Sequence, residues 1–370
     1  MSTDPRIGKR AMTSDLQSQT IEAPRILIVK RSSLGDVVLA LPVACALRDR
    51  YPQAHIAWVV ESRFADVVLG HPALDEVILV NRQYLGRPLD LAREWWRMRG
   101  ELRRRRFDWT IDLQGLFKSA MLLPCSGAVR RIGRAEHRRE LSYLLYSERS
   151  PLQPENLHAV NRYLEVAEYL GCDISRPRFD LPVQPGSLEW ADAVIRDAAM
   201  PANRPLVGLN AGTSHPKKCW PPERFVEVAN AVSDVNWIVL GGPDEKDLAS
   251  GIADQISGPN VVTAGRTDLP KLVAMLSRLD AIISGDTGPM HISAALGVPV
   301  VALFGPTNPA TNGPFGPQHR VLAPRAAAEA GKPRPSRRPT SSRAWFEPDD
   351  RDWMVEIQVP EVIAALRGVL

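Results

Sequence analysis

Nine short aliphatic runs, each of strand length, recur along the chain and alternate with segments of helical periodicity. Because the Val/Ile/Leu runs are nearly continuous, they indicate strands buried on both faces, as in a parallel sheet between helices. The expected strands are RILIVK (25–30), HIAWVVE (55–61), EVILV (76–80), WTIDL (109–113), PLVGLN (205–210), NWIVLGG (236–242), VVTAG (261–265), AIISGD (281–286) and PVVALFG (299–305). Expected helices cover 38–50, 160–170, 222–233, 246–257, 269–279 and 289–297.

The runs fall into two series, which predicts two doubly wound α/β domains, over 25–180 and 188–323. A length of 370 residues suits two domains of ordinary size. The stretch SRPRFDLPVQPGS (175–187) reads as a linker. Residues 1–24 lack an apolar core, so we expect a disordered leader rather than a signal peptide. Residues 324–370 read as a tail of low order whose last segment (360–370) forms a helix that packs back on the N-terminal domain.

Composition narrows the class of protein. A net charge of +4 does not by itself argue for nucleic acid as a partner. Cys45, Cys125, Cys172 and Cys219 have no metal-ligand or CxxC spacing, which favours a reduced, cytoplasmic protein. The apolar run 37–47 is too short to span a bilayer, so any membrane contact is expected to be peripheral.

Ligands of open α/β sheets bind beyond the carboxyl ends of the strands, so the loops that follow the strands are the candidate sites. The first loop, KRSSLGDVVLALP (30–42), offers Ser33, Gly35 and Asp36. One interpretation is helix capping, since serine and aspartate favour the first turn. The other is a carboxylate aimed at a ligand between the domains. The loop has neither the GxGxxG nor the GxxxxGK[ST] pattern.

Two further loops belong to the second series. NAGTSHPKKCWP (210–221) offers Thr213, Ser214 and Lys218, either as a phosphate site or as an ordinary solvated loop. GGPDEKD (241–247) offers Glu245, which would accept hydrogen bonds from a ribose diol or remain an exposed acid at a helix start.

The turn SGDTGPMHISAALG (284–297) is the richest of these loops. Gly288 permits close backbone approach, and Thr287 with the helix start suits a phosphate. Asp286 would repel a phosphate and is better placed on sugar hydroxyls. His291 lies in the first helical turn, where a structural histidine is commoner than a catalytic one.

The segment 97–139 holds 12 Lys and Arg against 4 Asp and Glu. Such an excess is usually a solvated face, but its concentration in one domain favours an anionic substrate or membrane surface. The triplet DRD (350–352) does not follow a strand, so we predict no metal site.

Three motifs together, ILIVKRSSLGDVVLALP, IDLQGLFKSA (111–120) and SGDTGPMHISAALGVPVVALFGPTNP, resemble glycosyltransferase family 9, the lipopolysaccharide heptosyltransferases, over residues 25–323. The resemblance implies a GT-B fold, in which two Rossmann-like doubly wound parallel-sheet domains face each other across a cleft. It also implies an inverting transfer of heptose from ADP-L-glycero-β-D-manno-heptose to the Kdo region of the inner core, without a cofactor. IDLQGLFKSA is closest to the type I enzyme.

The roles carried over by this resemblance divide between the two domains. Asp36 matches the general base. The donor would contact Thr213, Ser214, Lys218, Glu245, Asp286, Thr287, Gly288 and His291, and the acceptor Ser33, Gly35, Lys118 and Arg134. A sugar hydroxyl needs a base to attack near neutral pH, and the leaving diphosphate needs positive charge.

One departure leaves alternatives open. The stretch before the last helix lacks the cysteines that many relatives carry there. The alternatives are a family 9 enzyme with another donor or acceptor, a non-catalytic nucleotide-sugar-binding protein, or a GT-B epimerase. The resemblance argues against the epimerase. Peripheral contact with the cytoplasmic face of the inner membrane is also expected.

Overall fold

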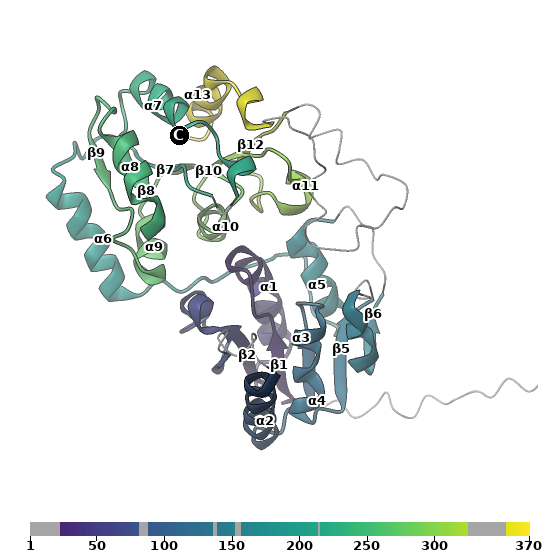
Figure 1. Ribbon diagram of the computed structural model, residues 1–370. Coiled ribbons are helices and arrows are strands. Elements are labelled where there is room, and N and C mark those ends of the chain that lie inside the picture. Colours follow the sequence, from purple (N-terminus) through teal and green to yellow (C-terminus); the bar gives the residue numbers. More distant parts are fainter. Residues whose placement is uncertain (1–22, 81–87, 136–138, 152–156, 214, 325–352) are drawn as a thin grey trace, which may run out of the picture.

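The computed structural model describes residues 23–80, 88–135, 139–151, 157–213, 215–324 and 353–370. They form two α/β halves, purple to teal and teal to yellow in Figure 1, each with a central six-stranded sheet. All strand pairs given by the structure are parallel. The predicted fold class, two doubly wound parallel-sheet domains, is confirmed.

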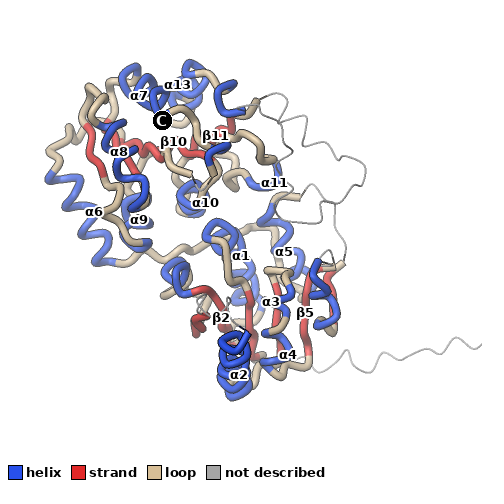
Figure 2. Tube along the Cα trace, viewed as in Figure 1, coloured by secondary structure: helices blue, strands red, loops and turns tan. Residues whose placement is uncertain are grey.

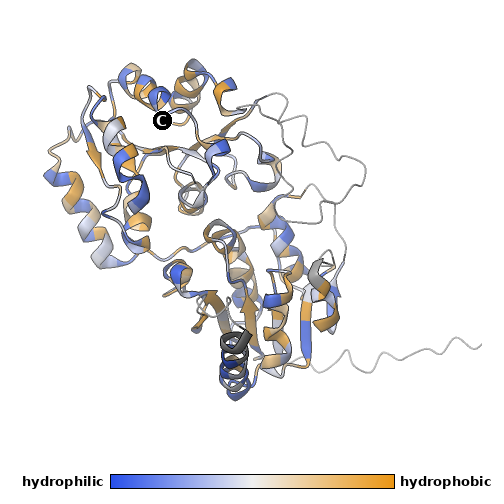
Figure 3. Cartoon of the chain, viewed as in Figure 1, coloured by the Kyte–Doolittle hydropathy of each residue, from blue (hydrophilic) through white to orange (hydrophobic). Residues whose placement is uncertain are grey.

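The first sheet has the order β3-β2-β1-β4-β5-β6. Its strands are β1 (Arg25–Val29), β2 (His55–Glu61), β3 (Glu76–Val80), β4 (Trp109–Asp112), β5 (Arg130–Arg134) and β6 (Glu148–Ser150). The last two were not predicted, because the sequence of β5, RRIGR, is mostly charged. Figure 3 colours β5 largely hydrophilic, in contrast to the apolar central strand β1.

The second sheet has the order β12-β11-β10-β7-β8-β9. Its strands are β7 (Leu206–Asn210), β8 (Asn236–Leu240), β9 (Asn260–Val262), β10 (Ala281–Gly285), β11 (Val300–Leu303) and β12 (Arg320–Leu322). Read from β9, this is the same strand order as in the first sheet. Strand order therefore reverses between β1 and β4 in one half and between β7 and β10 in the other, and such switch points are where α/β sheets bind ligands.

Helices cover both faces of each sheet (Figure 2). In the first half these are α1 (Leu34–Arg50), α2 (Pro88–Arg104), α3 (Phe117–Ala120), α4 (Leu122–Ser126) and α5 (Ala159–Tyr169), with the 3-10 helices η1 (Ser62–Val67) and η3 (Arg139–Leu145). In the second half they are α6 (Pro185–Asp197), α7 (Pro222–Ala231), α8 (Lys246–Ala253), α9 (Leu269–Leu276), α10 (Gly288–Ala295), α11 (Pro309–Asn312) and α13 (Val359–Arg367), with η4 (Pro216–Lys218), η5 (Pro243–Glu245) and η6 (Trp353–Glu356).

The six helices predicted from periodicity are all present, at α1, α5, α7, α8, α9 and α10. Helix α6 begins at Pro185, inside the stretch expected to be a linker. Proline is compatible with the first turn of a helix, so the Pro-Gly pair there opens a helix rather than excluding one.

The two halves touch through helices. Helix α1 is apolar nearly all round and is buried from Val37 to Leu47, because it packs against the first sheet, α5 and also α10 of the other half. Helix α9 packs against η1. Through these contacts one continuous apolar core includes residues of both sheets, among them Ile28 and Ile282.

The C-terminal helix corrects one prediction. Helix α13 was expected to pack on the N-terminal domain, but it packs on α7, β11 and β12 of the second half (Figure 1). Val362 and Leu366 on its apolar side are fully buried in that core. The sequence shows an apolar stripe but not which sheet the stripe covers. The expected leader lies almost entirely outside the described residues, as does most of the tail.

Candidate active site

The predicted loops meet where the first turns of α1 and α10 touch. Helix α1 follows β1 and α10 follows β10, so each starts at a carboxyl edge beside a switch point. A Cβ on Gly35 would lie 2.5 Å from Cδ2 of His291, and a Cβ on Gly288 would lie 2.6 Å from Cδ2 of Leu34. The two glycines therefore let the two loops approach, which joins Asp36 and the turn at Asp286 in one site.

Asp36 lies in the first turn of α1, and three neighbours hold its carboxylate. Ser33, the N-cap, donates from Oγ to Oδ2 at 2.9 Å. Tyr163 donates from its hydroxyl to Oδ1 at 2.8 Å, and Nζ of Lys30 lies 3.6 Å from Oδ1. The side chain is still 43% exposed, so it is open to a ligand.

These contacts decide the ionisation of Asp36. Burial alone would raise its pKa, but the charge of Lys30 and the hydrogen bonds from Tyr163 and Ser33 outweigh burial and lower the pKa to about 2. The carboxylate is therefore ionised at every physiological pH. Asp36 thus does both things that the sequence left open: it takes part in a helix cap, and it also presents an ionised carboxylate.

Lys30 and Tyr163 are two residues beside Asp36 that the sequence analysis did not single out. Lys30 is 3% exposed, and its ammonium lies 4.8 Å from the centre of the Tyr163 ring. Tyr163 comes from α5, which is 127 residues along the chain from Asp36. Lys30 ends a predicted strand and begins a predicted loop, so the sequence carried a signal for it, whereas it carried none for Tyr163.

Gln114 fixes the loop that leads to Asp36. Its Oε1 accepts from the backbone N–H of Arg31 at 3.1 Å and of Ser32 at 3.2 Å. Asp112 at the end of β4 in turn accepts from the backbone N–H of Gln114 at 2.9 Å. The motif IDLQG therefore supports the neighbouring loop at the β1/β4 switch point.

In the second half, Lys218 and Asp286 form an ion pair at 2.6 Å between Nζ and Oδ2. Their side chains are only 18% and 12% exposed, and Nε2 of His291 lies 3.8 Å from the other carboxylate oxygen. The structure thus brings together three predicted donor residues from two loops.

His291 is buried under both acids. Burial lowers its pKa below the ordinary value, although Asp286 and Asp36 both act to raise it. Its Nδ1 is buried and has no hydrogen-bond partner among the described residues. The neutral His291 ring packs against Gly35 and so joins the two halves of the chain. This position agrees with the structural interpretation of the histidine.

Thr287 is the N-cap of α10 and its hydroxyl belongs to a buried network. Asn210 donates from Nδ2 to Oγ of Ser284 at 3.0 Å and to Oγ1 of Thr287 at 3.2 Å. Sequence reasoning missed Asn210, which ends β7 and so links the loop after β7 to the turn after β10. Asp286, the partner of Lys218, comes immediately before this N-cap.

Thr213 and Glu245 are predicted donor contacts from two loops of the second half. Thr213 donates from its hydroxyl to the carbonyl of His215 at 2.8 Å. Glu245 accepts from the backbone N–H of Gly242 at 2.7 Å, and its carboxylate would clash with a Cβ on Gly212. Glu245 therefore lies against the loop that carries Thr213. Ser214 lies outside the described residues.

The predicted acceptor residues separate into two groups. Arg134 at the end of β5 is 5% exposed, with its guanidinium 5.8 Å from the Tyr163 ring, so it joins the cluster around Asp36. Lys118 lies exposed on α3, and the structure gives it no contact with that cluster.

The basic run Arg103–Arg106 lies at the other edge of the sheet. It ends α2 and precedes the amino end of β4, and the Arg105 backbone carbonyl accepts from Nε of Arg25 at the start of β1. Arg105 is also paired with Glu76 at 2.6 Å. This run therefore faces away from Asp36, because the site forms at the carboxyl ends.

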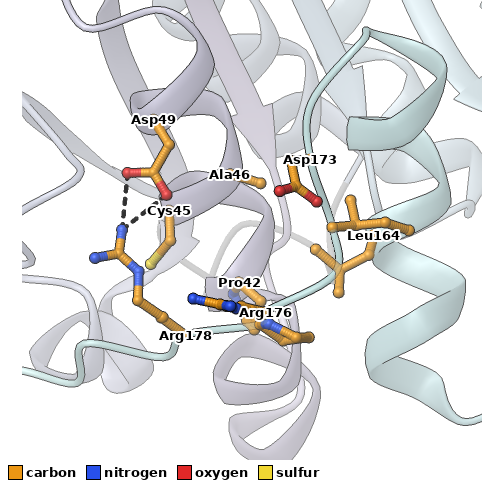
Figure 4. A pocket seen from close by; sticks show the side chains of 10 residues that line it. Pro42, Cys45, Ala46, Asp49, Leu164, Asp173, Arg176 and Arg178 are labelled. Atoms are coloured by element: carbon orange, nitrogen blue, oxygen red, sulfur yellow. Dashed lines mark hydrogen bonds and ion pairs between the residues drawn. The ribbon is translucent and has the colours of Figure 1, made fainter.

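A small surface pocket lies elsewhere and contains none of the candidate residues. It is lined by α1 and by the segment before α6, and an ion pair of 2.8 Å between Arg178 and Asp49 borders it (Figure 4). Among the described residues, no three His, Cys, Asp or Glu side chains gather in a way that would hold a metal ion. None of the described helices combines the length and hydrophobicity needed to cross a bilayer.

Comparison with known proteins decides the family. The family model for glycosyltransferase family 9 (heptosyltransferase) matches residues 95–337. Lipopolysaccharide heptosyltransferase 1 of Pseudomonas aeruginosa is 33% identical over 302 residues, covering 79% of this chain and 81% of the relative. The chain belongs to glycosyltransferase family 9. Lipopolysaccharide core heptosyltransferase OpsX of Haemophilus influenzae is 27% identical, covering 94% of this chain and 97% of the relative.

Solved structures agree with this family 9 assignment. The family 9 glycosyltransferase of Veillonella parvula superposes with a TM-score of 0.80 at 26% identity, covering 94% of this chain and 97% of that one. E. coli heptosyltransferase WaaC, solved with ADP, gives a TM-score of 0.67 at 27% identity, covering 80% and 92%. Both the sequence and the fold of this chain are therefore those of a family 9 glycosyltransferase.

Proposed function

We propose that this glycosyltransferase transfers heptose, with inversion, from ADP-L-glycero-β-D-manno-heptose to the Kdo region of lipopolysaccharide. The observation that carries the proposal is the meeting of two loops: the ionised Asp36 lies beside the Lys218–Asp286 pair, across the Gly35–His291 contact. Further support comes from relatives named lipopolysaccharide heptosyltransferases and from WaaC, which was solved with ADP.

In this proposal the acceptor hydroxyl gives its proton to a carboxylate oxygen of Asp36 as it attacks C1 of the heptose. The new C–O bond forms on the face opposite the departing diphosphate, and the electron pair of the broken C–O bond leaves with ADP. One base and no covalent intermediate are needed. With a pKa of about 2, Asp36 is a weak base, so proton transfer must occur late, when the attacking oxygen has become acidic.

The second half would hold the donor. Lys218 and the start of α10 supply positive charge for the diphosphate, and Asp286 would accept from sugar hydroxyls. When the diphosphate is bound, Lys218 exchanges part of its interaction with Asp286 for the phosphate. Thr213, Thr287, Gly288 and Glu245 complete this donor side, with Glu245 placed for the ribose.

The buried Arg134 and the exposed Lys118 would meet the anionic acceptor, together with the Ser33–Gly35 turn. We place this reaction at the cytoplasmic side of the inner membrane, where a lipid-linked acceptor would be presented.

ADP release across a panel of nucleotide sugars, with and without Kdo-bearing lipid A, tests the proposal. We expect rapid release only with ADP-heptose and acceptor together. Release with another donor would point to a different family 9 activity. Thermal protection by ADP-heptose without any release would identify a binding protein, and acceptor-independent conversion of the donor would identify an epimerase.

A further inference from the structure

Four large apolar side chains are exposed together beside the acceptor side of the site. Leu116 and Phe117, at the start of α3, are 38% and 42% exposed, and Leu141 and Leu144 of η3 are 56% and 64% exposed. Helix α3 and η3 pack against each other, and the Ser142 hydroxyl donates to the Gly115 carbonyl at 3.2 Å. We call these four residues the Leu–Phe ridge.

The ridge is held firmly although its side chains face solvent. Asp112, which is fully buried, accepts from the Ser119 hydroxyl at 3.2 Å and from the Tyr146 hydroxyl at 2.8 Å. These two bonds fix α3 and the residue after η3 to the end of β4. Because Asp112 also positions Gln114, the same network connects the ridge with the loop that leads to Asp36.

The backbone at Leu141 is unusual for an exposed leucine. Its φ is 60°, in the left-handed region that a branched side chain rarely adopts. A backbone in this conformation persists only where the surroundings impose it, and such positions gather at functional sites. Here the conformation exposes an apolar side chain to solvent, so the strained backbone does not help to bury that side chain in the core.

The charges beside the ridge are positive. Lys118 follows Phe117 and is exposed, and Arg149 is exposed with its guanidinium 5.2 Å from the Tyr143 ring and bonded to the Tyr143 carbonyl. Arg131 donates to the Leu145 carbonyl at 3.0 Å. The nearby acid Glu148 is paired with Arg130 at 2.8 Å.

We propose that the Leu–Phe ridge docks this chain on an anionic lipid surface. Leucine and phenylalanine side chains would enter the boundary between headgroups and acyl chains, while Lys118 and Arg149 meet the headgroup phosphates. A second copy of the chain fits less well, because a two-fold contact through the ridge would bring Lys118 and Arg149 close to the same charges of the partner copy.

This inference goes beyond the proposed function, since binding to lipid requires neither donor nor turnover. Only the functional advantage of docking rests on the proposed function, because docking through the ridge would turn the acceptor side of the site toward a lipid-linked acceptor.

Co-sedimentation of the full chain with lipid vesicles tests the inference. We expect binding to vesicles of phosphatidylglycerol and phosphatidylethanolamine, and little binding to phosphatidylcholine vesicles. The double variant Leu141→Ser/Leu144→Ser should lose about tenfold in partitioning, because two apolar side chains no longer enter the interface. Arg149→Glu should also lose about tenfold.

Leu69→Ser is the matched control. Leu69 is a leucine that is 40% exposed, but it follows η1 after β2, which the sheet order places away from β5 and β6. We expect this variant to bind vesicles like the parent chain. Melting temperatures near that of the parent would show that each variant is folded.

Equal binding to both kinds of vesicle, no binding to either, or full binding by the double variant would overturn the inference. Concentration-dependent dimerisation that the double variant abolishes would overturn it in favour of a second copy. Since these vesicles contain no acceptor, their result is independent of ADP release: a chain that binds them but never releases ADP contradicts only the proposed function.

Discussion

The chain builds the same strand–loop–helix turn twice, after β1 and after β10, and each turn carries one carboxylate, but the two are held in different ways. Asp36 is partnered by Lys30, which is buried and braced against the Tyr163 ring, while its own carboxylate is 43% exposed. Asp286 is 12% exposed and paired with Lys218, which comes from a separate loop.

This difference suits the two carboxylates to different roles. An ionised carboxylate with fixed partners on one side and solvent on the other can accept a proton from a group that has become acidic, although its low pKa makes it a weak base. A carboxylate paired with a lysine from another loop holds that lysine in place until a stronger anion competes for it. Two similar turns can therefore serve chemistry in one domain and donor binding in the other, and the following experiments test that division.

Asp36→Asn should have the largest effect. The amide keeps the size of the side chain but cannot take the proton, so we expect kcat to fall about 10²–10⁴-fold. Affinity for ADP-heptose and the melting temperature should change little. The equivalent change in the other turn, Asp286→Asn, should act mainly on the KM for the donor. If Asp36→Asn retains kcat, Asp36 is only a helix cap.

Lys218→Met comes next. Loss of a charge-assisted contact with the diphosphate costs about 1.5–3 kcal/mol, which corresponds to roughly 10- to 150-fold weaker binding of ADP. Titration calorimetry with ADP measures this directly. Lys217→Met removes the same charge one residue away and should change the affinity by about fivefold or less. Similar losses in both variants would mean that only the net charge of the loop matters.

Tyr163→Phe should have a smaller effect that depends on pH. The tyrosine donates to the ionised carboxylate, so its loss raises the pKa of Asp36 from about 2. The acid limb of the kcat profile should move up by about 1–2 pH units, with kcat near pH 7 changed by less than about tenfold. Tyr169→Phe on the same helix is the control, because its hydroxyl bonds Glu148 instead. If the acid limb does not move, Asp36 is not the group whose ionisation sets the pH dependence of kcat.

Excess EDTA should have the smallest effect. We expect turnover to continue because Lys218 and the start of α10 supply positive charge beside the leaving diphosphate. Loss of activity that magnesium or manganese restores would contradict this and would reassign the role of Lys218.

The sequence predicts this site unevenly, for physical reasons. Asp36 and Asp286 were predicted as site residues because parallel strands end at one edge of a sheet, so residues just after the strands converge there. Lys218 was predicted from the loop that follows β7, and the structure pairs it with Asp286. Tyr163 and Asn210 were missed, since each acts through tertiary contacts that no local pattern records. The charged strand β5 was not predicted because it has few aliphatic residues. Its last residue, Arg134, was predicted from the resemblance as an acceptor contact, and in the structure it lies 5.8 Å from the Tyr163 ring, near Asp36.

The contacts of the C-terminal segment have a consequence for how the protein is made. Trp220, in the same loop as Lys218, donates to the Ile357 carbonyl 137 residues later, and Met354 packs on Gly305 beside the Lys217 carbonyl. A nascent chain on the ribosome can thus expose every candidate donor residue before the segment that supports their loop has been translated. Donor affinity should therefore mature late in synthesis, well after the strands of the second sheet have emerged.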